Sequence, residues 1–134
     1  MRAVSSSRPD TAAVLARKAE DDARAVRILA PDSAIADRIV GFHAQQAIEK
    51  WLKAAIVARQ LPEARIHDIG RLIQILENAG VEVPADADRL DELTIYAVPM
   101  RYDELLLEVE PLDRDEAASV VDSVATWAME ELDR

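Results

Sequence analysis

The chain has 134 residues, of which half are apolar and 31% are charged, and its formal net charge is -10. This length is typical of one domain with one hydrophobic core. Because the sequence has no cysteine, it excludes disulfides, thiolate metal sites and a cysteine nucleophile. No stretch approaches the roughly 18 unbroken apolar residues of a membrane-spanning helix, and the first ten residues lack the apolar run of a secretion signal. We therefore expect a cytoplasmic protein with no membrane contact.

The charges are unevenly distributed along the chain. Residues 1–75 carry 12 basic and 9 acidic side chains, whereas residues 76–134 carry 4 basic and 17 acidic ones. A general nucleic-acid binder needs a broad basic surface to neutralise phosphates, and this balance argues against one. A local basic groove is still compatible with the sequence, and we expect the two halves to face different partners.

Residues 1–9 are predicted to form a flexible N-terminal arm, followed by a helical domain over residues 10–134. The apolar residues are mostly Ala, Leu, Ile and Val, with few aromatics and three glycines, which favours helices over sheets. A first helix is predicted to begin near Pro9 and to run to about Ala30, where Pro31 and Asp32 end it. Positions on one face of it follow steps of four and three, namely Leu15, Ala19, Asp22, Val26 and Leu29.

The second predicted helix is long, with Asp32 or Ser33 as its N-cap and its end at Gln60. It is apolar on three sides, which are formed by Ile35, Ile39, Phe42 and Val57, by Val40, Ala44, Ala47, Trp51 and Ala55, and by Ile48, Leu52 and Ile56. A helix that is apolar nearly all round is surrounded. We therefore expect a central helix, covered by its neighbours on two sides and by a second subunit on the third.

Three more helices are predicted from local signals. Asp68 caps a short helix with an apolar stripe (Ile69, Leu72, Ile73 and Leu76) that ends at Gly80. A fourth helix runs from about Asp86 through Leu90, Leu93, Thr94 and Ala97 to a stop at Pro99. Asp113 and Glu116 form a capping box before a last helix that runs to the C-terminus. Together these elements predict an all-α fold, a four- to five-helix antiparallel up-down bundle.

Two classes of ligand site are excluded by residue type and spacing. The three glycines, Gly41, Gly70 and Gly80, are not clustered, so there is no glycine-rich phosphate loop. His43 and His67 lack carboxylates at the spacings of paired metal-binding helices. We predict neither a metal site nor a cofactor.

His43, Gln46 and Lys50 lie at steps of three and four on the second predicted helix. One interpretation is a polar seam that satisfies buried backbone groups. The other is a pocket in which imidazole, amide and ammonium bind an anionic ligand such as a nucleotide. His67, beside Asp68 at a helix start, is either a capping element or a ligand contact.

Two arginines have neighbours that could be functional. Arg38 and His43 lie five residues apart, as in some ribonuclease motifs, but on one helix this step turns about 140° and the side chains point apart. Arg101 and Tyr102 follow Pro99 in a predicted bend. They either pair with nearby acids or contact a phosphate or a partner.

Three strings together resemble the HEPN domain family (higher eukaryote and prokaryote nucleotide-binding): FHAQQAIEKWLKAAIVARQ at 42–60, IHDIGRLIQIL at 66–76 and LTIYAVPMRY at 93–102. The AEDD run at 19–22 also fits, so the similarity covers nearly all of residues 11–132. The resemblance implies a helical bundle that forms a homodimer, often encoded beside a minimal nucleotidyltransferase as a toxin–antitoxin pair.

The resemblance also implies a ribonuclease motif, R-x4-6-H, before the last helix, and the equivalent stretch here begins at Arg101. No histidine follows Arg101, and four acids, Asp103, Glu104, Glu108 and Glu110, would repel an RNA backbone there. Without an imidazole this stretch has no group suited to proton transfer near neutral pH. We expect a diverged member that is not an enzyme, and no catalytic residue is assigned.

Three functions remain open. The preferred one is a dimeric module that binds a nucleotide or a partner protein, such as a minimal nucleotidyltransferase, through His43, Gln46, Lys50, His67, Arg101 or Tyr102. The second is a metal-independent ribonuclease toxin. The third is a structural interaction domain without a small ligand. Tyr96 and Tyr102 are the two tyrosines available for modification.

Overall fold

The structure is a computed structural model that describes residues 7–62, 67–84, 89, 92–97 and 111–134. Within these residues the elements are α1 (Ser7–Leu29), α2 (Asp37–Ala58), α3 (Ile69–Asn78), the 3-10 helix η1 (Glu92–Ala97) and α6 (Arg114–Leu132). The predicted all-α bundle is confirmed, with four α-helices packed together and no strand in the described part of the chain. No described helix is long and apolar enough to cross a membrane.

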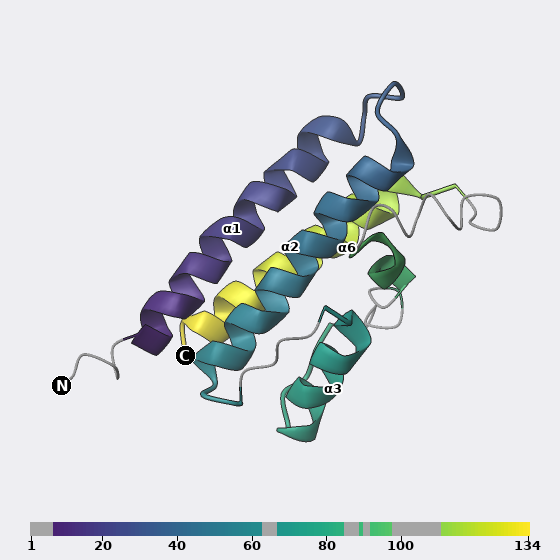
Figure 1. The fold of residues 1–134 in the computed structure, drawn as a ribbon. Helices are drawn as coiled ribbons and strands as arrows, with labels where there is room; N and C mark the ends of the chain where they lie inside the picture. The colour runs from purple at the N-terminus through teal and green to yellow at the C-terminus, as the bar shows by residue number, and fades with distance from the viewer. Residues whose placement is uncertain (1–6, 63–66, 85–88, 90–91, 98–110) are drawn as a thin grey trace.

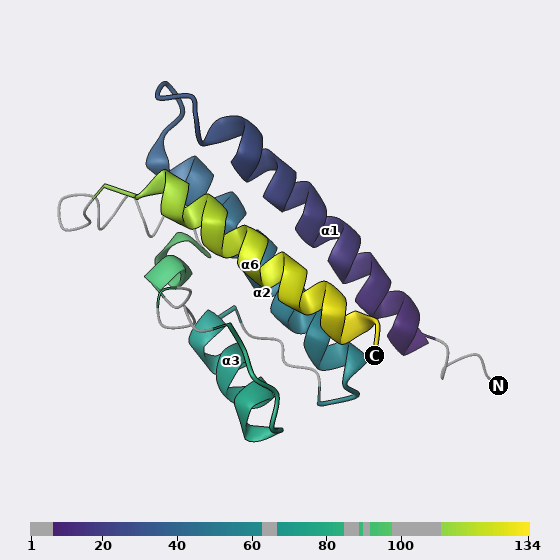
Figure 2. The same ribbon diagram turned by 180° about the vertical axis from the view of Figure 1, so that it is seen from behind.

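The three long helices lie side by side, with α6 behind α2 in Figure 1 and in front of it in Figure 2. α1 runs antiparallel to α2. α6 runs in the same direction as α2, because ion pairs join their first turns (Arg114 to Asp37) and their ends (Arg59 to Glu131). The intervening α3 and η1 pack on the side of α2 that faces away from α1 (Figure 1).

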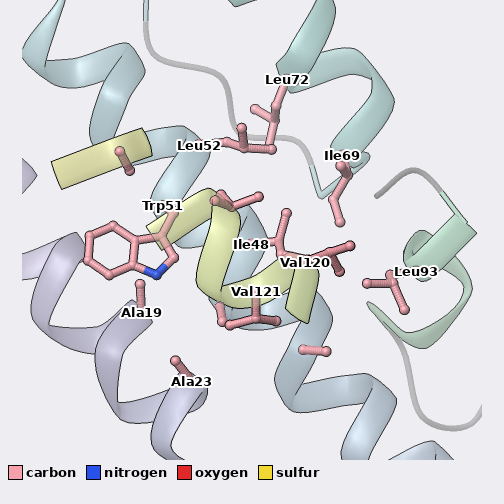
Figure 3. Close-up of a cluster of buried hydrophobic side chains, with 14 of the residues drawn as sticks. Ala19, Ala23, Ile48, Trp51, Leu52, Ile69, Leu72, Leu93, Val120 and Val121 are labelled. Atoms are coloured by element: carbon pink, nitrogen blue, oxygen red, sulfur yellow. The ribbon is translucent and has the colours of Figure 1, made fainter. Parts of the chain in front are cut away.

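α2 is the centre of the core, as predicted. Its side chains Ile48 and Leu52 meet Ile69 and Leu72 of α3, while Trp51 points toward Ala19 of α1 (Figure 3). Ile48, Leu52 and Ile56 are at most 1% exposed within the single chain. The expectation that a second subunit covers this third apolar face is therefore wrong, because α3 and the other elements of the same chain already cover it.

The start of α2 also differs from the prediction. Neither Asp32 nor Ser33 is the N-cap; α2 begins at Asp37 after Ala36, which makes no side-chain capping bond. Asp32 instead accepts from the amide of Ala34 (2.9 Å) in a turn. Arg114 donates to backbone carbonyls on both sides of this turn, which holds residues 30–36 out of the helix. α2 ends at Ala58, two residues before the predicted Gln60, which has a positive φ of 60°.

The other helix boundaries are largely those that local signals predict. α1 begins at Ser7, slightly before Pro9, so residues 7–9 of the predicted arm are helical. Asp68 accepts from the amide of Arg71 (3.3 Å) at the start of α3, and Asp113 accepts from that of Glu116 (3.0 Å) at the start of α6. Gly80 follows α3 with a φ of 83°. Of the predicted fourth helix, Glu92–Ala97 form η1, and residues 86–88, 90–91 and 98–99 lie outside the described residues.

Gly41 is required by the contact between α2 and η1. A Cβ atom at position 41 would lie 2.5 to 2.8 Å from three ring atoms of Tyr96, which is itself buried. Alanine normally favours a helix by about 1 kcal/mol over glycine, but forcing extra volume into a packed site costs about 1–3 kcal/mol. We expect Gly41→Ala to lower the free energy of unfolding by about 1 kcal/mol in urea titrations. In a Tyr96→Ala background the same change should be neutral or stabilising. An equal loss in both backgrounds would show that Tyr96 is not the cause.

Candidate ligand-binding face on α2

The structure places four of the six predicted site residues close to one another. His43, Gln46 and Lys50 lie on consecutive turns of α2, and His67 directly precedes α3. Each of the four side chains makes a hydrogen bond to another side chain of this region. Arg101 and Tyr102 lie outside the described residues.

His43 and Lys50 meet a carboxylate of α1 that the sequence did not single out as polar. Asp22 accepts from Nδ1 of His43 (2.9 Å) and from Nζ of Lys50 (2.5 Å). The signal in the sequence was a carboxylate at a core position of the first helix, among Ala19, Ala23 and Val26, which are all fully buried. We refer to Asp22, His43 and Lys50 as the Asp22 unit.

A second carboxylate, Glu49, has an equivalent set of partners on the other flank of α2. Its Oε2 accepts from Nζ of Lys53 (2.9 Å) and from Nδ1 of His67 (2.8 Å). Its Oε1 accepts from Nε2 of Gln45 (2.8 Å). We refer to Glu49, Lys53 and His67 as the Glu49 unit. Like the Asp22 unit, it joins one carboxylate to one lysine and one histidine.

The Glu49 carboxylate is stabilised as an anion although it is buried. Burial alone would raise the pKa of Glu49, but hydrogen bonds from Lys53, Gln45 and His67, together with the charge of Lys53, outweigh it and lower that pKa below its ordinary value. Because the carboxylate can only accept, Nδ1 of His67 carries the proton of this bond. The other ring nitrogen, Nε2, accepts a hydrogen bond when the ring is neutral and donates one when the ring is protonated.

Two amide side chains adjoin the Glu49 unit. Gln46 donates to Oε1 of Gln45 (2.7 Å), and Gln45 also reaches the backbone carbonyl of His67 (3.4 Å). Gln45 is completely buried, whereas Gln46 is partly exposed. The hydrogen bonds of His43, Gln46 and Lys50 described here go to side chains, namely Asp22 and Gln45.

The carboxylates lie beneath the donors. The side chains of Asp22 and Glu49 are 13% and 5% exposed, whereas those of Lys50, Lys53, His43 and His67 are 24%, 19%, 30% and 72% exposed. The face of α2 between α1 and α3 thus presents ammonium, imidazole and amide groups outward, with each lysine held by an inner anion. We call the outward groups the donor face: His43, Gln46, Lys50, Lys53 and His67.

Other chemistry finds little support among the described residues. Arg38 and His43 lie on the same straight stretch of α2, where five residues turn about 140°, and His43 is engaged by Asp22 instead. No group of three or more His, Asp or Glu side chains that could hold a metal ion occurs in the described ranges.

Two hollows of the surface lie along α6 and are acidic, whereas a third, of about 440 Å³ on α1, is lined by Arg17, Lys18, Arg24, Glu20 and Asp21. One, of about 510 Å³, lies between η1 and α6; its rim carries Glu92, Asp113 and the ion pair of Arg89 with Glu116. Another, of about 780 Å³, is lined by Asp115, Asp122, Glu130 and Trp127. Carboxylates repel anions at close range, so both hollows along α6 are less suited to a phosphate than the donor face is.

Comparison with known proteins gives one match. A model of the HEPN domain matches residues 12–132. Neither the curated proteins nor the solved structures contain a match.

Proposed function

Because the chain belongs to the HEPN domain family over residues 12–132, we propose that it is a HEPN-type binding module whose donor face takes the phosphates of a nucleotide. His43, Gln46 and Lys50 are the direct contacts in this proposal, and His67 extends the face toward α3. The proposal treats the protein as a binder and not as an enzyme.

The proposal rests on one observation: two lysines of α2 lie above carboxylates, Lys50 above Asp22 of α1 and Lys53 above Glu49 of α2. A carboxylate beneath each lysine, buried for Glu49 and largely buried for Asp22, orients the ammonium while leaving two of its three protons for a ligand. Hydrogen bonds between charged partners are about twice as strong as neutral ones, so a phosphate at this face gains from each lysine. The hollows along α6 offer carboxylates instead.

The proposal predicts that Lys50→Gln weakens nucleotide binding. We expect calorimetric titration with ATP or GTP to show binding to the native protein and at least tenfold weaker binding to the variant, a loss of about 1.4 kcal/mol or more. The matched control is Lys18→Gln, which removes the same charge from an exposed position of α1. Equal weakening by both variants would assign the effect to net charge, and the absence of binding to the native protein would favour a structural domain without a small ligand.

Metal-independent RNA cleavage is the alternative within the family, which includes ribonucleases. In that reading His43 would act with Arg38, or Arg101 would act with a histidine of a second subunit. Purified protein that cleaves RNA without metal, and loses the activity in His43→Ala or Arg101→Ala, would replace binding with catalysis as the function.

The proposal includes a protein partner and a homodimer. HEPN domains are often partnered with nucleotidyltransferases, and we propose a minimal nucleotidyltransferase in a toxin–antitoxin-like pair as the partner here. Since the third apolar face of α2 is covered within the chain, the dimer would have to use another surface, and sedimentation as a monomer would contradict it.

Tyr96 is 4% exposed, which makes it a poor target for modification in the folded state.

A further inference from the structure

The Asp22 unit and the Glu49 unit repeat one arrangement on the two flanks of α2. Each holds a nearly buried carboxylate that accepts from one lysine Nζ and one histidine Nδ1 at 2.5 to 2.9 Å. The first lies against α1 and the second against the residue before α3. The direct contacts proposed above were His43, Gln46 and Lys50, and the repetition adds Lys53, held by Glu49, as the matching cation of the second unit.

The spacing of the two units is set by the helix. Lys50 and Lys53 are three residues apart on α2, which places their Cβ atoms about 5–6 Å from each other on neighbouring turns. The phosphoryl groups of consecutive nucleotides, and the first and third groups of a triphosphate, are separated by a similar distance, whereas groups that share a bridging oxygen lie closer together. Lys50 and Lys53 can therefore present one cation to each of two such groups.

From this repetition we infer that the two units bind one ligand at two points, each unit taking one of two linked phosphoryl groups. This inference rests on the proposed function and narrows its ligand to a multiply phosphorylated one. Gln46 adds a partly exposed amide to the same face of α2, and its Nε2 donates to Oε1 of Gln45. The shared chemistry fits either a nucleoside triphosphate or a short stretch of RNA backbone.

The test compares ligands with one and with two or more phosphoryl groups on four proteins. Affinities for a nucleoside monophosphate, the matching triphosphate, inorganic triphosphate and a short oligoribonucleotide are measured without divalent cations. The proteins are native, Lys50→Gln, Lys53→Gln and the control Lys18→Gln. The arginine variants Lys50→Arg and Lys53→Arg retain each cation, and circular dichroism confirms the fold of every variant.

Two-point binding predicts that the native protein holds the triphosphate or the oligoribonucleotide at least tenfold tighter than the monophosphate. Either glutamine variant should lose that advantage, the arginine variants should keep most of it, and Lys18→Gln should match the native protein. The ligand that shows the advantage identifies the source of the phosphoryl pair.

Two results would overturn the inference in different ways. Equal affinity for the monophosphate, the triphosphate and the oligoribonucleotide, or a loss confined to Lys50→Gln, would leave a single phosphate site and the proposed function intact. Failure of every ligand to bind the native protein would remove the proposed function together with the two-point model.

Discussion

Replacing Arg114 with alanine should lower the free energy of unfolding by about 3 kcal/mol. Arg114 begins α6, and its guanidinium donates to Oδ1 of Asp37 (2.9 Å) and to the carbonyls of Ala30 (3.2 Å), Asp32 (3.0 Å) and Ile35. The side chains of Arg114 and Asp37 are 18% and 24% exposed. Alanine would leave a partly buried carboxylate and several carbonyls without this donor, and orphaned buried groups cost more than the net value of the bonds.

The planar fork of the guanidinium is the reason for this effect. Arg114→Lys keeps the charge but offers a single nitrogen, so we expect it to recover less than half of the loss. Arg71→Ala is the matched control, because Arg71 is exposed and bonds to Gln74 within the same helix; its effect should stay within about 0.5 kcal/mol. Urea titration measures the free energy of unfolding of the three variants, Arg114→Ala, Arg114→Lys and Arg71→Ala. Full stability of Arg114→Lys would show that charge alone holds the α1–α2 turn to α6.

Glu49→Gln should cost about 2–3 kcal/mol at neutral pH, and the cost should be smaller in acid. The change removes the anion that accepts from Lys53, His67 and the fully buried Gln45. The pKa of Glu49 is lower in the folded protein than its ordinary value, for the causes given above. A carboxyl with a lowered folded pKa stabilises the fold above its unfolded pKa of about 4.3, and this stabilisation is lost as the pH falls through the folded pKa.

Denaturant unfolding of native protein and variant at a series of pH values measures this difference. The two curves of stability against pH should lie apart near pH 7 and approach each other below the ordinary range of a glutamate carboxyl. Glu77→Gln, the same chemical change at an exposed position near the end of α3, is the control and should lie close to the native curve throughout. A pH-independent gap for Glu49→Gln would assign its cost to packing, not to ionisation.

The parts of the fold that sequence patterns predicted are those with local causes. Asp68 and Asp113 cap amides three residues ahead of them, and Gly80 supplies a positive φ directly after a helix, so neighbouring residues sufficed. The start of α2 was missed because its cause is remote. Arg114 lies 79 to 84 positions from the carbonyls that hold the preceding turn, and no local pattern records that contact.

The same distinction applies to the site. His43, Gln46 and Lys50 could be grouped because they share one helix with steps of three and four. Their acid partner Asp22 is 21 positions from His43, and which rotation of α1 brings it to α2 depends on the packing of the whole interface. His67 was a candidate, but Glu49 and Lys53 were not, because their connection to it crosses the loop between α2 and α3.

The inner carboxylates beneath the donor face have a consequence for the effect of salt. Pairs that are less than 3 Å apart and partly buried are little weakened by mobile ions, whereas the field of the whole protein, with a net charge of -10, is screened within about 8 Å at physiological ionic strength. An approaching anion is therefore repelled by the molecule at long range and attracted by the lysines at short range. Added salt weakens the long-range repulsion more than the short-range attraction. The affinity for an anion should therefore not fall steeply with salt, as it does for basic nucleic-acid binders.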